Sequence, residues 1–192
     1  MEKSVKWPLQ NPAFLILDVQ KEYLRAHPEF RRIFPRIYEL AVECRATGIP
    51  VIHTLTLHSR DRSSFTAVDA KFKRIHCIEG TECAEEVDLL ANPRDVYVHK
   101  HMWSAFYQTR LDEILKSKKI DTLILSGLLT HCCVYATAID AVQRHYKVIF
   151  AKDAIDSYRK GLHKTLMQGF FKNSVGEVTT TTDIIKRIKA LQ

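Results

Sequence analysis

The fold of this chain is organised around residues 123–134, which read LILSGLLTHCCV. The run from Thr122 to Leu125 is apolar and too short for a helix, which predicts a buried strand. Ser126 and Gly127 then predict a turn. Beyond them, apolar residues recur at helical spacing and predict a helix. They are Val134, Ala138, Ala141 and Val142.

Two adjacent thiols, Cys132 and Cys133, lie where this helix is expected to begin. Free N–H groups and the helix dipole at such a point favour a thiolate and bind a developing oxyanion. Open α/β sheets also place their ligands at the strand-to-helix turn. Most free cysteines, however, are small apolar core residues. The position alone therefore leaves both a core role and a reactive role open.

The composition is that of an ordinary globular chain. With 192 residues, of which 46% are hydrophobic and 27% charged, we expect one domain over residues 1–192. Five cysteines form an odd set without the spacing of a disulfide framework. The first residues lack the apolar segment of a signal peptide, and no run of about 18 apolar residues predicts a membrane span. We expect a cytoplasmic protein with no membrane partner.

The net charge of +7 raises the question of nucleic-acid binding. The basic residues are spread over most of the chain, with short clusters such as 116–119. Such residues are typical of solvated helix faces rather than of a continuous binding stripe. We therefore expect no nucleic-acid partner.

Apolar runs alternate with helical patterns along the whole chain. This alternation predicts an α/β fold with a six-stranded, mostly parallel sheet that helices cover on both faces. The strands are expected at 13–19, 49–57, 95–99, 122–125, 147–151 and 174–179. The helices are expected at 36–46, 110–117, 134–142 and 162–170, with a last one that Thr182 or Asp183 caps.

Two charged residues follow predicted strands, as the thiols do. Asp18 ends the first strand and Lys100 the third. A lone carboxylate in that place is usually a turn residue, and a lone lysine is usually solvated. Because the carboxyl ends of parallel strands share one edge, Asp18, Lys100 and Cys133 can also converge there.

Three motifs resemble the signature elements of the isochorismatase-like cysteine hydrolases, which include nicotinamidases and N-carbamoylsarcosine amidases. The motifs are D-x-Q-x-x-F/Y at 18–23, K-x-x-x-S-A-F at 100–106 and G-x-x-T-x-x-C-V at 127–134. The resemblance extends from Ala13 to Ile185 and implies a Rossmann-like three-layer α/β/α sandwich. It also implies a hydrolase of a small amide, ureido or related C–N substrate.

The resemblance assigns the chemistry to three side chains. It implies that Cys133 is the nucleophile, that Asp18 is the general base and that Lys100 stabilises the thiolate. It further implies an oxyanion hole of two backbone N–H groups, those of Leu129 and Cys133, beside a cis peptide bond between Leu128 and Leu129.

Aromatic residues next to the motifs are candidates for the substrate pocket. They are Tyr23, Trp103 and Phe106. A large aromatic residue is more often part of the core, so each has a structural alternative.

A metal ion is a separate question. In the nicotinamidases, a D-x-H pair after the second strand and a later histidine hold a metal. Here Thr56 replaces the aspartate, whereas His58 and His76 match the two histidines. Two imidazoles without a carboxylate make a weaker site. We therefore expect no metal and no cofactor.

The resemblance implies a small-molecule substrate and a homodimer or homotetramer. The polar excursion Ser59 to Lys73 is long for a compact domain, which favours a functional role such as covering a neighbour's pocket. Three alternatives stay open. They are an isochorismatase-type vinyl-ether hydrolase, which does not need the thiol, a binding or scaffold protein that retains the fold, and a redox role for the paired cysteines, which their adjacency disfavours.

Overall fold

One sheet forms the centre of the protein. The computed structural model describes residues 6–73 and 76–191, and all strand pairings within them are parallel. The strands are β1 (Pro12–Leu17), β2 (Val51–Thr56), β3 (Val96–Lys100), β4 (Thr122–Leu128), β5 (Lys147–Asp156) and β6 (Glu177–Thr179). Their order across the sheet is β3-β2-β1-β4-β5-β6. The predicted α/β class and six-stranded sheet are confirmed, and the sheet is parallel throughout.

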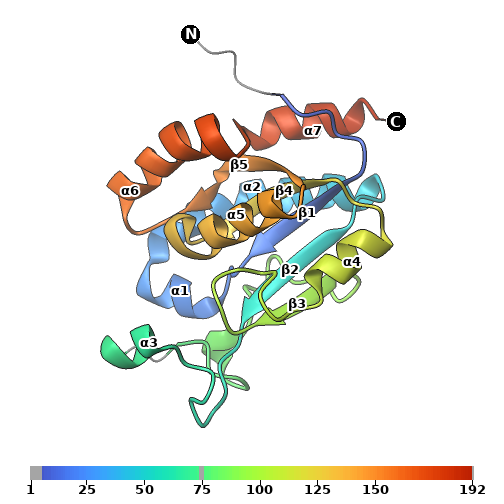
Figure 1. Ribbon diagram of the computed structural model, residues 1–192. Helices are drawn as coiled ribbons and strands as arrows, with labels where there is room; N and C mark the ends of the chain where they lie inside the picture. Colours follow the sequence, from blue (N-terminus) through green and yellow to red (C-terminus); the bar gives the residue numbers. More distant parts are fainter. Residues whose placement is uncertain (1–5, 74–75, 192) are drawn as a thin grey trace.

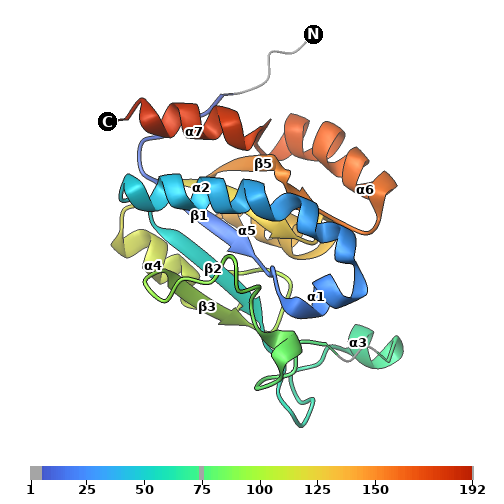
Figure 2. The ribbon, with the colours of Figure 1, turned by 180° about the vertical axis from the view of Figure 1, so that it is seen from behind.

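Helices cover both faces of the sheet and complete three layers (Figure 1). The α-helices are α1 (Lys21–Ala26), α2 (Phe34–Ala46), α3 (Ala67–Lys71), α4 (Leu111–Ser117), α5 (Tyr135–Gln143), α6 (Lys160–Thr165) and α7 (Thr181–Lys189). One face packs on α2 and α7, which lie in front in Figure 2. The other packs on α4 and α5, together with the π-helical segment Leu166–Val175 that continues α6.

The central strands are buried on both sides, as their apolar sequences predict. Every residue of β1 and β4 is buried. Alternate residues enter the two cores, so that Phe14 and Ile16 face one layer while Leu15 and Leu17 face the other. This packing fixes the carboxyl ends of the strands along a single edge.

The turn predicted at Ser126 and Gly127 is wrong, because β4 continues to Leu128. Gly127 lies opposite Leu17 of β1 and has a φ of 102°. A Cβ there would lie 2.1 Å from the carbonyl oxygen of Leu17, so only glycine permits this close approach. β4 therefore ends three residues later than the sequence predicted, at Leu128 instead of Leu125.

Other boundaries also differ from the sequence-based expectation. Residues 24–34, which had no predicted structure, form the end of α1 and a 3₁₀ turn, Pro28–Ile33. The last strand is shorter than predicted and covers Glu177–Thr179, because the preceding helical segment runs on to Val175. Thr180, rather than the next polar residues, caps α7 by accepting a hydrogen bond from the N–H of Asp183.

The excursion after β2 leaves the body of the protein as an arm that carries α3 (Figures 1 and 2). A reciprocal cap holds the start of α3, since Thr66 accepts from the N–H of Asp69 and donates its own N–H to the Asp69 carboxylate. Within the described ranges, no helix has both the length and the apolar character that crossing a bilayer requires.

Candidate active site

Asp18, Lys100 and Cys133 meet at the carboxyl edge of the sheet. Asp18 follows β1, Lys100 is the last residue of β3, and Cys133 lies in a π-helical turn, Thr130–Val134, between β4 and α5. Asp18 and Lys100 are at most 1% exposed, and Cys133 is 6% exposed. The structure thus brings together the three side chains that the sequence motifs singled out.

Lys100 is the common partner of the other two. Its Nζ lies 2.8 Å from Asp18 Oδ2 and 3.4 Å from Cys133 Sγ. It also donates to Thr56 Oγ1 at 2.8 Å and to the Met102 carbonyl at 2.9 Å. Burial lowers the pKa of Lys100, but the charges of Asp18 and Cys133 outweigh this effect and raise it. The amine therefore stays an ammonium ion at neutral pH.

Asp18 occupies an uncommon backbone conformation, with a φ of 50°. Its N–H donates to the Thr54 carbonyl of β2, and its Oδ1 accepts a hydrogen bond of 3.2 Å from Thr54 Oγ1. Lys100 holds the second oxygen. These contacts fix the carboxylate beside the thiol.

The environment of Cys133 differs from what a helix start alone predicts. Burial and the adjacent Asp18 carboxylate raise the pKa of the Cys133 thiol well above its usual range, and Lys100 opposes them only in part. A helix start favours a stabilised thiolate, whereas burial and the neighbouring Asp18 side chain in the structure favour a neutral thiol beside the Lys100 ammonium group. A proton acceptor is then required before the sulfur can attack.

Gln20, the glutamine of the first motif, is a buried residue that the sequence-based assignment of roles left out. Its side chain donates to two carbonyls, that of Thr56 at 2.9 Å and that of Ala84 at 2.6 Å. It also accepts from the N–H of Thr56 at 3.0 Å. Gln20 thereby ties the end of β2 to the loop at residue 84 next to the site.

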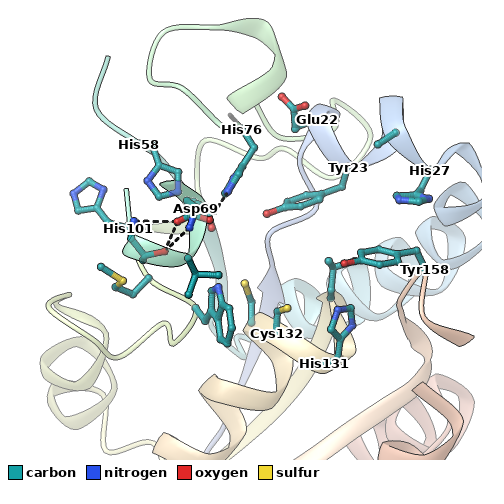
Figure 3. A pocket seen from close by; sticks show the side chains of 18 of the residues that line it. Glu22, Tyr23, His27, His58, Asp69, His76, His101, His131, Cys132 and Tyr158 are labelled. Atoms are coloured by element: carbon teal, nitrogen blue, oxygen red, sulfur yellow. Dashed lines mark hydrogen bonds and ion pairs between the residues drawn. The ribbon is translucent and has the colours of Figure 1, made fainter. Parts of the chain in front are cut away.

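Above the three residues lies a cavity of about 390 Å³ (Figure 3). Cys133 contributes to its floor together with Thr56 and Leu129, and the peptide bond that joins Leu129 to Leu128 is cis. The polar lining of the cavity includes Glu22, His27, His58, Thr66, Asp69, His76, His101, His131 and Arg159.

Two of the three aromatic candidates line this cavity. Tyr23 and Trp103 do so, and Tyr158 joins them from the loop after β5. Phe106 is a core residue instead, 4% exposed and stacked on Tyr146 at a ring separation of 5.8 Å. Its side chain belongs to the apolar core that also contains Ala138 and Ala141 of α5.

One wall carries three aromatic rings in contact, those of His27, Tyr158 and His131. Tyr158 lies parallel to His27 at 4.9 Å and edge-on to His131 at 5.2 Å (Figure 3). Arg159 follows Tyr158 at the rim, and no carboxylate pairs with its guanidinium among residues 6–73 and 76–191. This wall combines flat apolar surface with a positive charge.

The opposite wall holds His58 and His76, as the motif comparison implies, with Asp69 from α3 (Figure 3). Burial and the neighbouring His76 lower the pKa of His58 to about 4, so it is neutral at pH 7. Thr56, which replaces the metal-binding aspartate, instead accepts the hydrogen bond from Lys100. Asp69 lies 13 residues after Thr56, and no motif in the sequence includes it.

Comparisons with known proteins agree with this architecture. The isochorismatase domain model matches residues 12–183. N-carbamoylsarcosine amidase of Arthrobacter sp. is 28% identical over 191 residues, which cover 94% of this chain and 72% of that protein. The isochorismatase family protein YwoC of Bacillus subtilis is 34% identical over 95 residues, and this match spans about half of each chain.

Among solved structures, a cysteine hydrolase from Pseudomonas syringae pv. phaseolicola 1448A superposes with a TM-score of 0.93. It is 26% identical, and the match covers 100% of this chain and 99% of that one. The family model spans most of the chain and contains Asp18, Lys100 and Cys133 within its limits. The chain belongs to the isochorismatase family.

Proposed function

We propose that this protein is a cysteine-dependent hydrolase of a small amide, ureido or related C–N substrate, with Cys133 as the nucleophile. The observation that carries the proposal is the position of Lys100 Nζ, 2.8 Å from the Asp18 carboxylate and 3.4 Å from the Cys133 sulfur, beneath an open cavity. A nucleophile, a base and a cation in mutual contact are what thiol-dependent acyl transfer requires. Neither binding alone nor vinyl-ether hydrolysis requires the thiol.

The first half of the reaction uses the proton on Cys133. Asp18 accepts that proton as the sulfur attacks the carbonyl carbon, and a tetrahedral oxyanion forms. The N–H groups of Leu129 and Cys133 stabilise the oxyanion in this proposal. Asp18 then returns the proton to the leaving nitrogen, the C–N bond breaks, and a thioester with Cys133 remains.

The second half regenerates the thiol. Asp18 takes a proton from water as the water oxygen attacks the thioester carbonyl. The C–S bond breaks, the acid product leaves, and the sulfur regains its proton from Asp18. Lys100 keeps its positive charge throughout, and it stabilises both the carboxylate and the sulfur as negative charge moves between them.

The lining of the cavity narrows the substrate class. A volume of about 390 Å³ suits a small molecule. Tyr23, Trp103 and Tyr158 offer flat walls, and Arg159 offers a cation to a carboxylate on the substrate. An amide or ureido compound that carries a carboxylate fits these groups better than a neutral one.

Two further expectations stay predictions. A homodimer or homotetramer agrees with the family resemblance and with exposed apolar residues on the arm, Val68 and Phe72. Light scattering that returns a 22.2 kDa particle at micromolar concentration would reject it. The cytoplasmic location also stays a prediction.

Ammonia release from a panel of primary amides and N-carbamoyl amino acids tests the proposed function. We expect at least one good substrate, and we expect Cys133→Ala to abolish its turnover. Cys132→Ala is the matched control, because it removes the adjacent thiol, and it should keep at least about half of the activity. Equal turnover by Cys133→Ala and the unmodified protein would reject the proposed nucleophile.

A further inference from the structure

Thr56 lies beside the three reacting side chains, although the proposed reaction assigns it no role. It is the last residue of β2, and in the parallel register it lies opposite Lys100, the last residue of β3. Lys100 Nζ donates a hydrogen bond of 2.8 Å to Thr56 Oγ1. Thr56 is 5% exposed and lines the cavity together with Cys133. Its side chain therefore belongs to the floor of the site.

The ammonium group of Lys100 determines how this hydroxyl can bond. An ammonium group has three protons and no lone pair, so it can only donate hydrogen bonds. Its short contacts are with Asp18 Oδ2 at 2.8 Å, Thr56 Oγ1 at 2.8 Å and the Met102 carbonyl at 2.9 Å. The Thr56 oxygen is therefore the acceptor in its contact with Lys100, and its own proton needs another acceptor.

The hydroxyl proton of Thr56 has no acceptor within the described parts of the protein, residues 6–73 and 76–191. A buried donor without an acceptor costs free energy. Because Thr56 lines the cavity, a molecule bound there can supply the acceptor. The hydrogen bond that the hydroxyl receives from the ammonium group polarises it and makes it a stronger donor.

Gln20 holds the backbone of Thr56 in place. Its side-chain oxygen accepts a hydrogen bond of 3.0 Å from the N–H of Thr56, and its side-chain nitrogen donates one of 2.9 Å to the carbonyl of Thr56. Gln20 is fully buried and also donates to the Ala84 carbonyl at 2.6 Å. The hydroxyl thus lies on a backbone that is fixed before a ligand binds, and a preorganised donor loses less entropy on binding.

Thr56 approaches the cavity from a different side than the proposed oxyanion donors. Strand β1 lies between β2, which ends at Thr56, and β4, which precedes Leu129 and Cys133. Lys100 Nζ lies within 3.4 Å of both Thr56 Oγ1 and Cys133 Sγ, so the hydroxyl and the thiol are close neighbours. A substrate whose carbonyl oxygen meets the N–H groups of Leu129 and Cys133 therefore presents a different atom to Thr56.

We propose that the Thr56 hydroxyl is a substrate-binding donor that selects compounds with an oxygen or nitrogen acceptor next to the carbon that Cys133 attacks. A compound without this acceptor leaves the polarised hydroxyl unpaired, and sites of this kind discriminate strongly against such analogues. The inference rests on the proposed function for the identity of the reaction. Its test requires only that Cys133 reacts with an alkylating reagent, so it can succeed or fail whether or not an amide substrate is found.

Alkylation of Cys133 by iodoacetamide and by iodoethane tests the proposal. Both reagents transfer a two-carbon group to the thiol and release iodide, but only iodoacetamide carries a carbonyl oxygen next to the attacked carbon. We expect Thr56→Val, which keeps the shape and the strand preference of threonine, to slow labelling by iodoacetamide at least about fivefold and labelling by iodoethane less than about twofold. Thr56→Ser restores a hydroxyl and should return the iodoacetamide rate to within about twofold of the unmodified protein. Peptide mass spectrometry of timed samples gives the rate at Cys133.

Thr54→Val is the matched control. Thr54 lies two residues earlier in β2, is fully buried and donates a hydrogen bond of 3.2 Å to Asp18 Oδ1, and the cavity lining does not include it. Its loss acts on the thiol through Asp18, so it should change both labelling rates by the same factor. Thr56→Ala gives the same comparison if Thr56→Val does not fold. Equal slowing of both reagents by the Thr56 variant, or an unchanged rate with iodoacetamide, would overturn the proposal, because the hydroxyl would then act through Lys100 or not at all.

Discussion

Lys100 Nζ lies 2.8 Å from Asp18 Oδ2, and neither side chain is exposed to solvent. A buried ion pair is costly to form and more costly to break, because the remaining charge loses its partner. The same lysine contacts Cys133, so removing its charge should affect both the stability of the fold and the reactivity of the thiol.

Lys100→Met should therefore destabilise the fold by about 3–5 kcal/mol, since it leaves Asp18 as an unpaired buried charge. The double variant Asp18→Asn with Lys100→Met removes both charges and should recover most of that loss while remaining inactive. Urea unfolding of the two single variants and the double variant measures the coupling. Additive losses would show that the pair has no special contribution to stability.

Asp18→Asn tests the proposed role of Asp18 as the proton acceptor. Asparagine retains the shape of the side chain and its contact with Thr54, but it cannot accept the thiol proton. We expect turnover to fall by at least about a hundredfold on any substrate that the panel identifies. Steady-state kinetics with a circular-dichroism check of folding measures this. Retention of more than one-tenth of the activity would remove Asp18 from the proposed role.

We expect stability to depend on pH through His163, which contacts the turn that contains Cys133. Its Nδ1 lies 2.7 Å from Thr130 Oγ1, whose hydroxyl also donates to the Asp156 carbonyl. Burial lowers the pKa of His163, and the positive charge of Lys160 adds to this effect, whereas Asp156 opposes it. As pH falls below about 6.5, the unfolded chain binds a proton at His163 while the folded protein does not. The free energy of unfolding therefore decreases as pH falls through this range.

His163→Asn keeps a hydrogen-bond donor, the side-chain amide, near Thr130 and removes the titratable imidazole. Between pH 6.5 and 5, the slope of the free energy of unfolding against pH should decrease by an amount that corresponds to at most about one proton. The free energy of unfolding at pH 8 should change little. Urea unfolding at each pH gives the slopes. An unchanged slope in the variant would show that this histidine does not titrate differently in the two states.

Arg159 predicts a preference among substrates. Removing its charge with Arg159→Gln should raise the KM for a carboxylate-bearing substrate about tenfold or more, because a charged hydrogen bond contributes about 1.5–3 kcal/mol. A neutral amide should be affected less than about twofold. Arg94→Gln, an exposed arginine outside the cavity, is the control for net charge. Equal effects on both substrates would argue against carboxylate recognition.

The sequence could predict those features that depend on local pattern. Alternation of apolar runs and helical spacing was sufficient for the layered sheet, and short motifs located Asp18, Lys100 and Cys133. Gly127 was misassigned to a turn, because a positive φ in a strand is set by the approach of Leu17 and not by the neighbouring letters. Local pattern therefore predicted that β4 exists, but it did not predict the residue at which β4 ends.

Residues that act through tertiary contacts were not predictable in this way. Asp69 reaches His58 and His76 only because the arm folds back with α3 at its tip. Phe106 belongs to a matching motif, yet its ring enters the core under α5 and not the cavity. The raised pKa of Cys133 likewise depends on burial and on Asp18, which lies 115 residues earlier in the chain.

The central claim is that Cys133 forms a covalent acyl intermediate, and mass spectrometry of acid-quenched turnover mixtures tests it most directly. A good substrate should leave an adduct on the protein whose mass is that of the substrate less its leaving amine, and peptide mapping should place it on Cys133. Cys132→Ala should form the same adduct, and Asp18→Asn should form at most a trace. Full turnover without any adduct, or an adduct that persists in Cys133→Ala, would contradict the account.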